Sequence, residues 1–348
     1  MDNHSSMNEL LRNGSNGSMC EIEDGFLAMT LPITYSIISV TGFFSNSLAL
    51  WVFFFGTRKT NSITVYLKNL AMADLLLALC LPFRATYQNQ IGPPILCKVV
   101  GIIFYLTMYV SIFLLSLISL DRYLKIIRPL QQYRIHTVPH STTASRVVWF
   151  LCAGSMLPFF FDGGERGHCG HRCFHFKNRG ILGSIFNMLA VATFFLLLLF
   201  FFYSYGKISL KLRAVALKNS KKTSTRAILK TFVVLAVFVM CFTPYHVVRV
   251  PYILAQVGVI PSTESRQALH LANEMVLCIS ALNCCFDPVI FFFLSSSFKR
   301  AMLASTHGKL KRALQKNQGV LNPRKSTSEF RIQRIELHGL RESMENTQ

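Results

Sequence analysis

Charged residues are scarce in this chain of 348 residues, and acidic residues are the scarcest. Asp, Glu, Lys and Arg make up 15% of the sequence, against roughly 25% in an ordinary soluble domain, whereas 51% of the residues are hydrophobic. Asp and Glu number 16 against 36 Lys and Arg, which gives a net charge of +20. This composition disfavours a soluble enzyme and predicts a polytopic membrane protein.

Catalytic and pore-forming motifs are also lacking. The chain has no Gly-x-Ser-x-Gly and no His-Glu-x-x-His segment, which leaves a membrane enzyme only a remote alternative. It has no filter-like sequence and no internal repeat, so a channel and a transporter are disfavoured. We expect a protein that is not an enzyme and needs no organic cofactor.

Seven apolar segments are long enough to cross a bilayer as helices. The uninterrupted runs cover residues 27–55, 99–120, 180–206 and 231–248. Shorter or interrupted runs cover about 62–87, 143–161 and 275–298. The sequence therefore predicts an all-α membrane protein, a seven-transmembrane helix bundle over residues 27–298 with the two termini on opposite sides.

The two sides of the membrane differ in sequence. Glycosylation acceptor triplets occur only in the polar tail of residues 1–26, at Asn3, Asn13 and Asn16. Eight Lys and Arg residues between positions 207 and 230 have no acidic neighbour. By the positive-inside rule, we expect a multi-pass plasma-membrane protein with an extracellular N-terminus and a cytoplasmic C-terminus. The basic loops are expected to contact membrane lipid, not nucleic acid.

The chain turns polar and basic after Phe298. Residues 299–314 predict a short amphipathic helix on the inner membrane surface. Residues 315–348 predict a disordered cytoplasmic tail.

Two acidic residues, Asp74 and Asp287, lie inside predicted spans, where an ionisable group is costly and invites a functional interpretation. Ser111 and Asn283 offer further oxygen atoms within the spans. Oxygen ligands suit a small hard cation, so we predict that these four residues bind an allosteric sodium ion. The alternative is a polar contact that only specifies helix packing.

Three motifs follow one another in the spans. They are Asp121-Arg122-Tyr123, then Phe238 with Phe242-Thr243-Pro244, then Asp287-Pro288-Val289-Ile290-Phe291. Together they resemble the rhodopsin-like family of G-protein-coupled receptors, over about residues 26–303. The resemblance implies that Asp121 restrains Arg122 until activation, that Arg122 then meets the G protein, and that span six swings about Pro244, since proline kinks a helix.

Two positions depart from the family pattern. Phe291 stands where the family usually has Tyr, so the hydroxyl expected to reach Tyr205 is missing. Phe242 stands where Trp is frequent. The first departure predicts altered signalling efficiency but leaves the fold unchanged.

The cysteines on the outer side form a second expectation. The resemblance implies a disulfide between Cys97, at the start of span three, and Cys173, in the loop after span four. Cys20 and Cys169 are the remaining extracellular cysteines, which suggests a second bridge between them. An alternative for the Cys and His residues of positions 168–175 is a zinc site, which their irregular spacing disfavours.

Cations mark the extracellular half of the predicted bundle. They are Arg84, Lys98, Lys177 and Arg249. Arginine pairs with phosphate or carboxylate in a two-pronged geometry, so the cluster predicts an anionic ligand. For the lysines, the alternative is a rim residue that extends to water.

One acid, Glu274, lies beside Asn273 at the outer end of span seven. Either Glu274 pairs with Arg249, or it faces the cavity and accepts an ammonium group. With Tyr105 and Tyr109 as hydroxyl donors, the second arrangement fits a zwitterionic head group.

Shorter segments carry a finer resemblance. Cys80-Leu81-Pro82-Phe83-Arg84, Pro244-Tyr245-His246 and Asn273-Glu274-Met275 resemble the purinergic-like branch of the family, above all its lysophosphatidylserine receptors. The resemblance implies a lysophospholipid ligand, coupling mainly to Gi/o proteins, and regulation by arrestin and receptor kinases. A nucleotide or sugar-nucleotide receptor of the same branch is the alternative.

Overall fold

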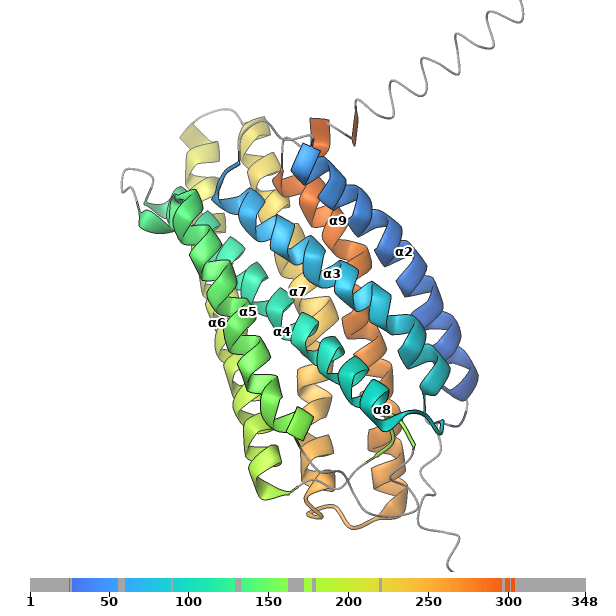
Figure 1. Cartoon of the computed structure of the whole chain (residues 1–348). Coiled ribbons are helices and arrows are strands. Elements are labelled where there is room, and N and C mark those ends of the chain that lie inside the picture. The colour runs from blue at the N-terminus through green and yellow to red at the C-terminus, as the bar shows by residue number, and fades with distance from the viewer. Residues whose placement is uncertain are drawn as a thin grey trace, which may run out of the picture. The chain divides into compact units, whose positions relative to one another are not determined.

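The computed structural model describes the helical part of the chain. The described residues are 25, 27–55, 60–88, 90–128, 133–161, 172–176, 180–218, 221–295, 298–300 and 302–303, without the side chains of 215–218 and 221–231. The helices are α2 (Leu27–Phe55), α3 (Ser62–Tyr87), α4 (Pro94–Ile127), the 3-10 turn η2 (Arg134–His136), α5 (Val138–Phe161), α6 (Ile181–Lys218), α7 (Lys221–Gln256), α8 (Thr263–Ala281) and α9 (Asn283–Leu294). Figure 1 shows them packed side by side.

The predicted all-α fold is confirmed. Within the described ranges, seven helical segments are long and apolar enough to cross a membrane. The largest correction concerns span seven, which runs from Thr263 to Leu294 instead of beginning near residue 275. Polar residues such as Glu264 and Arg266 in its first turns hid this start from a search for apolar runs.

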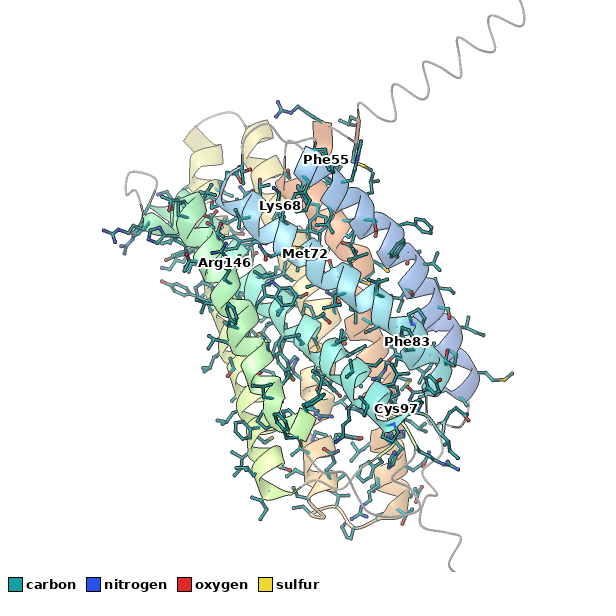
Figure 2. The ribbon with its side chains drawn as sticks, viewed as in Figure 1. Phe55, Lys68, Met72, Phe83, Cys97 and Arg146 are labelled. Carbon is teal, nitrogen blue, oxygen red and sulfur yellow. A yellow bond between two sulfur atoms is a disulfide. The ribbon has the colours of Figure 1, made fainter. Side chains whose placement is uncertain are left out.

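Apolar side chains cover the outside of the bundle, as a lipid solvent requires. Phe55, Met72 and Phe83 are 80%, 47% and 47% exposed, and all three point away from the helices in Figure 2. The interior instead holds polar residues, including Asn46 and Asp74, both 0% exposed. In a bilayer such buried polar groups need partners within the bundle.

Two prolines in the spans leave carbonyl groups that α2 satisfies. Proline has no N–H, so it cannot bond to the carbonyl four residues earlier. Pro82 frees the Ala78 carbonyl, which accepts a 2.7 Å hydrogen bond from the Ser39 hydroxyl. Pro288 frees the Cys284 carbonyl, to which the amide of Asn46 donates at 2.8 Å. These side chains fasten α2 to α3 and to α9.

Close approach of α2 and α9 also depends on Gly42. A Cβ atom added at this residue would lie 2.8 Å from the Cys284 sulfur. The contact is too short for any larger residue without a shift of the helices. Gly42 therefore lets the Asn46 amide reach the α9 backbone.

The terminal expectations fall mostly outside the described residues. The acceptors Asn3, Asn13 and Asn16, most of the helix expected over residues 299–314 and the tail beyond it stay predictions. Residues 298–300 and 302–303 are helical, which is consistent with a short helix after span seven.

Candidate functional site

Arg84 is held by a buried ion pair. From α3, its Nη2 atom lies 2.8 Å from Oε2 of Glu274 on α8, and the two side chains are 2% and 4% exposed. Its Nε atom donates to the Tyr35 hydroxyl on α2 at 3.2 Å. The guanidinium also lies 4.8 Å from the ring centroid of Phe104 and 4.7 Å from that of Phe174. Arg84 is thus neutralised and enclosed.

The alternative in which Glu274 pairs with Arg249 is wrong. Besides Arg84, the Glu274 carboxylate accepts hydrogen bonds from Gln88 at 3.1 Å and from Asn273 at 3.3 Å. Neighbouring residues on a helix point about 100° apart, so Glu274 faces α3 while Asn273 faces α7. The amide of Asn273 occupies the place beside Arg249 that the alternative gave to the carboxylate.

Arg249 of α7 is equally buried, at 3% exposure, but has only neutral partners among the described residues. Nη1 donates to Oδ1 of Asn273 at 3.2 Å, and Nη2 donates to Oδ1 of Asn187 on α6 at 3.0 Å. Its Nε atom has no described hydrogen-bond partner. Within the described set, no carboxylate lies within 4.0 Å, the distance of an ion pair. A buried cation with this surrounding favours an external anion.

Aromatic rings surround Arg249. Its guanidinium lies 5.9, 5.8 and 5.1 Å from the ring centroids of Tyr105, Tyr245 and Tyr252. Rings at this distance stabilise a cation without neutralising it. The structure thus brings Tyr105 to the cluster as predicted.

The remaining predicted ligand residues divide into two groups. Tyr109 lies one helical turn deeper on α4, with its ring edge against His246 at 6.0 Å between centroids. Lys98 is partly buried in the first turn of α4. Lys177 lies outside the described residues, so its role stays a prediction.

Several residues of the cluster escaped the sequence analysis. Asn187 and Gln88 are single amides in apolar helices and gave a weak signal. Tyr245 and Tyr252 lie four residues before and three residues after Arg249, which places them on its face of α7. That spacing was readable in the sequence.

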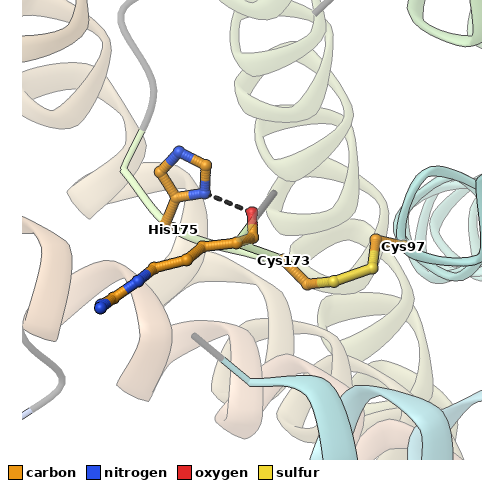
Figure 3. Close-up of a disulfide and its surroundings, with 4 residues drawn as sticks. Cys97, Cys173 and His175 are labelled. Carbon is orange, nitrogen blue, oxygen red and sulfur yellow. Dashed lines mark hydrogen bonds between the residues drawn. A yellow bond between two sulfur atoms is a disulfide. The ribbon is translucent and has the colours of Figure 1, made fainter. Parts of the chain in front are cut away.

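A disulfide between Cys97 and Cys173 anchors the loop over this cluster, as expected (Figure 3). The Cys173 amide donates to the Gln90 carbonyl at 2.9 Å. The next residue, Phe174, has a φ of 55°, in the left-handed region that non-glycine residues seldom adopt. This turn places the Phe174 ring against Arg84. Cys20 and Cys169 lie outside the described residues, so the second bridge stays a prediction.

The four residues expected to bind sodium lie buried in the middle of the bundle. Asp74 accepts a hydrogen bond from the Asn283 amide at 3.1 Å. Its second oxygen and both oxygens of Asp287 have no described partner. The two carboxyl groups are close enough to interact. Three unpaired acceptor oxygens fit a small hard cation, while the described contacts do not connect Ser111 to either carboxylate.

On the opposite end of the bundle, Asp121 gathers three donors. Ser62 and His136 bond to its Oδ1 at 2.9 and 2.8 Å, and Lys125 lies 2.8 Å from its Oδ2. The carboxylate therefore ties α3, α4 and the η2 turn together.

The expected pair between Asp121 and Arg122 is not formed among the described contacts. Because Asp121 faces α3, its neighbour on the helix points elsewhere, and Arg122 donates to the Leu294 carbonyl at 3.2 Å. Tyr123 points outward beside Tyr203, with 6.1 Å between ring centroids. Phe291 is fully buried against Phe53, at 5.5 Å.

A column of aromatic rings connects the two ends through α6 and α7. His246 stacks on Phe194 at 3.7 Å between centroids, Phe194 stacks on Phe238 at 5.5 Å, and Phe238 stacks on Phe201 at 4.0 Å. Tyr205 follows Phe201 at 5.6 Å, and Phe242 packs edge-on against Phe238 at 5.6 Å. The predicted activation residues of α7, with Pro244 two residues beyond Phe242, thus contact the ligand-side residue His246 through packing.

Comparison with known proteins fits this arrangement. A family model described as "7 transmembrane receptor (rhodopsin family)" matches residues 45–291. The chain is 39% identical over 329 residues to "Probable G-protein coupled receptor 34" of Pan troglodytes, covering 91% of this chain and 84% of the relative. It is 32% identical over 296 residues to the platelet-activating factor receptor of Homo sapiens, covering 80% and 86%. It is 32% identical over 292 residues to purinoceptor 14 of Bos taurus, covering 81% and 86%.

Proposed function

The chain belongs to the rhodopsin family of seven-transmembrane receptors, and we propose that its ligand is a zwitterionic lysophospholipid, with lysophosphatidylserine as the best fit. Membership makes the protein a receptor that signals through a G protein, not an enzyme. Membership fixes neither the ligand nor the G-protein subtype, which depend on the residues of the site.

One observation carries the proposal: Arg249 is buried beneath the disulfide-anchored loop with only neutral partners among the described residues. Its guanidinium has lost water, and it gains full charge compensation only when an anion arrives. A phosphate accepts two parallel hydrogen bonds from arginine. The phosphodiester of a lysophospholipid supplies such a group while its acyl chain stays in the apolar bundle.

The ion pair between Arg84 and Glu274 narrows the head group. A serine head group carries one carboxylate and one ammonium, so it can interact with both members of the pair without leaving either charge unmatched. A head group with only negative charge would meet the buried Glu274 carboxylate. The pair therefore favours a zwitterionic serine over a purely anionic group.

A nucleotide or sugar-nucleotide ligand is the second candidate, and the similarity to a purinoceptor favours it. Its phosphates would also satisfy Arg249. They would be repelled by Glu274, which lies one residue from Asn273 in the same hydrogen-bonded cluster.

Orientation and signalling partners belong to the same proposal. The disulfide between Cys97 and Cys173 supports an extracellular position for that end, because disulfides form in oxidising compartments. The G protein then binds at the end that carries Arg122, and we assign Gi/o coupling, arrestin and receptor kinases from the family branch. A sodium ion held by Asp74 and Asp287 would stabilise one conformation of the bundle.

The test is Gi-linked signalling in cells that express the full chain. Lysophosphatidylserine and a panel of nucleotides are applied to the wild type, Arg249→Ala and Glu274→Lys at matched surface expression. Arg266→Ala is the control, because this outer-end arginine bonds the Ile260 carbonyl outside the cluster. We expect a lysophosphatidylserine response that both pocket variants lose and the control keeps. A nucleotide response that survives Glu274→Lys would move the assignment to the second candidate.

A further inference from the structure

A second cationic site lies on the outer surface of the bundle, where α3 packs against α2 and α5. Lys68 is the sixth residue after the first residue of α3, so it lies about 9 Å along the helix from Ser62, at 1.5 Å per residue. Its side chain is only partly buried, and its Nζ atom lies 4.8 Å from the ring centroid of Phe54 near the end of α2. A cation at this depth on an outward face calls for an explanation.

A second cation lies at a similar depth on the neighbouring helix. Arg146 of α5 is exposed and comes eight residues after the first residue of that helix, about 12 Å along it. The indole N–H of Trp149 donates to Oδ1 of Asn69 at 3.2 Å, which fixes the register of α5 against α3. Lys68 precedes Asn69, and Arg146 lies one turn before Trp149. Figure 2 shows both cations on the same visible side of the bundle.

Both side chains extend toward the cytoplasmic boundary. Side chains on a helix tilt toward its N-terminus, and α3 and α5 both begin at the end of the bundle that holds the Asp121 cluster. No acidic residue compensates them: α2 and α5 contain none, and the single acid of α3, Asp74, is fully buried. The patch therefore has two outward cations and no described counter-charge.

An apolar stripe continues below Lys68. Met72, Leu79 and Phe83 are the exposed large apolar side chains of α3, at 47%, 51% and 47% exposure. At 100° per residue, they lie within about 60° of Lys68 around the helix. Met72 and Leu79 lie about 6 and 16 Å from Lys68 along the axis, a span that one acyl chain of an inner-leaflet lipid can follow.

We propose that Lys68 and Arg146 bind one anionic phospholipid of the cytoplasmic leaflet, with its phosphate between the two cations and an acyl chain along Met72 and Leu79. Charge complementarity selects the occupant. A sterol offers no anion, and a zwitterionic phospholipid brings an ammonium group into a patch that already holds two cations. This site is separate from the ligand cluster around Arg249.

The test titrates the purified full-length receptor with phosphatidylglycerol and measures the first bound lipid by native mass spectrometry. Phosphatidylglycerol is anionic and lacks the ammonium of the proposed receptor ligand. We expect Lys68→Gln and Arg146→Gln each to weaken its binding about fivefold, which corresponds to about 1 kcal/mol per basic residue near an anionic surface. Lys68→Arg keeps the charge and is expected to stay within twofold of the wild type.

Lys207→Gln is the matched control. Lys207 is also an exposed lysine beside an aromatic ring, 5.8 Å from the Tyr203 centroid, but on α6. We expect no change in this variant and weak binding of phosphatidylcholine to the wild type. Equal loss in Lys207→Gln, equal affinity for phosphatidylcholine, or unchanged binding in Lys68→Gln and Arg146→Gln would each overturn the proposal.

Discussion

Two buried arginines with different partners should respond oppositely to changes in charge. Arg84 has a carboxylate at 2.8 Å, whereas Arg249 has amide oxygens and tyrosine rings. We predict that Glu274→Gln destabilises the unliganded receptor, because it leaves Arg84 charged and buried without a counter-charge. Arg249→Gln should leave the unliganded receptor as stable as the wild type or more stable, because it removes a buried charge that the described residues do not neutralise.

The size of the difference follows from the burial of the ion pair. Removing one member of a buried pair costs about 3 to 5 kcal/mol. At about 2 to 4 °C per kcal/mol for a domain of this size, the Tm of Glu274→Gln should fall by roughly 10 °C. The Tm of Arg249→Gln should fall by less than about 2 °C, within the range of a neutral surface substitution.

The assay can use the cysteines of the bundle. Cys80, Cys152, Cys241, Cys278 and Cys284 are buried and reduced, so a thiol-reactive dye reports their exposure as purified receptor is heated. Arg266→Gln is the control for loss of an arginine outside the cluster. A Tm loss in Arg249→Gln as large as that in Glu274→Gln would refute the reasoning, since it would show that Arg249 already has an anionic partner.

Three further predictions concern other parts of the bundle. Gly42→Ala should lower stability by about 1 to 3 kcal/mol through overpacking against Cys284; Cys284→Ala in the same chain should restore the Tm, and a failure to do so would contradict the cause. Asp74→Asn should abolish any decrease in agonist affinity caused by sodium chloride relative to choline chloride; an unchanged sodium effect in radioligand binding would exclude this residue as a ligand. His136→Ala removes one of three donors to Asp121 and should increase basal G-protein activation, measured as nucleotide exchange without agonist, whereas an unaltered basal rate would show that Ser62 and Lys125 suffice.

The spans could be predicted because lipid imposes a simple rule on sequence. Apolar runs and basic loops identified all seven, but the start of span seven at Thr263 was missed, since its first turns are polar. The prolines were also visible. That Ser39 and Asn46 of α2 would satisfy the carbonyls they free could not be predicted, because it depends on how α2 is rotated against α3 and α9.

The residue types of the ligand cluster were predictable, and their pairing was not. Sequence patterns pointed to Arg84, Arg249, Asn273 and Glu274, yet which arginine meets the carboxylate depends on the rotation of α8. The structure gives Glu274 to Arg84 and leaves Arg249 with amides. The same limit applies to Asp121, whose partner was expected to be the adjacent Arg122 and is instead a set of three residues from other turns.

Direct binding of labelled lysophosphatidylserine to the purified receptor is the most direct test of Arg249 as the anion-binding residue. The wild type and Arg249→Gln are compared after both are shown to be folded by their thermal unfolding. We predict saturable binding to the wild type and a loss of affinity of at least tenfold in Arg249→Gln, in line with about 1.5 to 3 kcal/mol for a hydrogen bond to a charged group. Equal affinity in a folded Arg249→Gln receptor would contradict the proposed site.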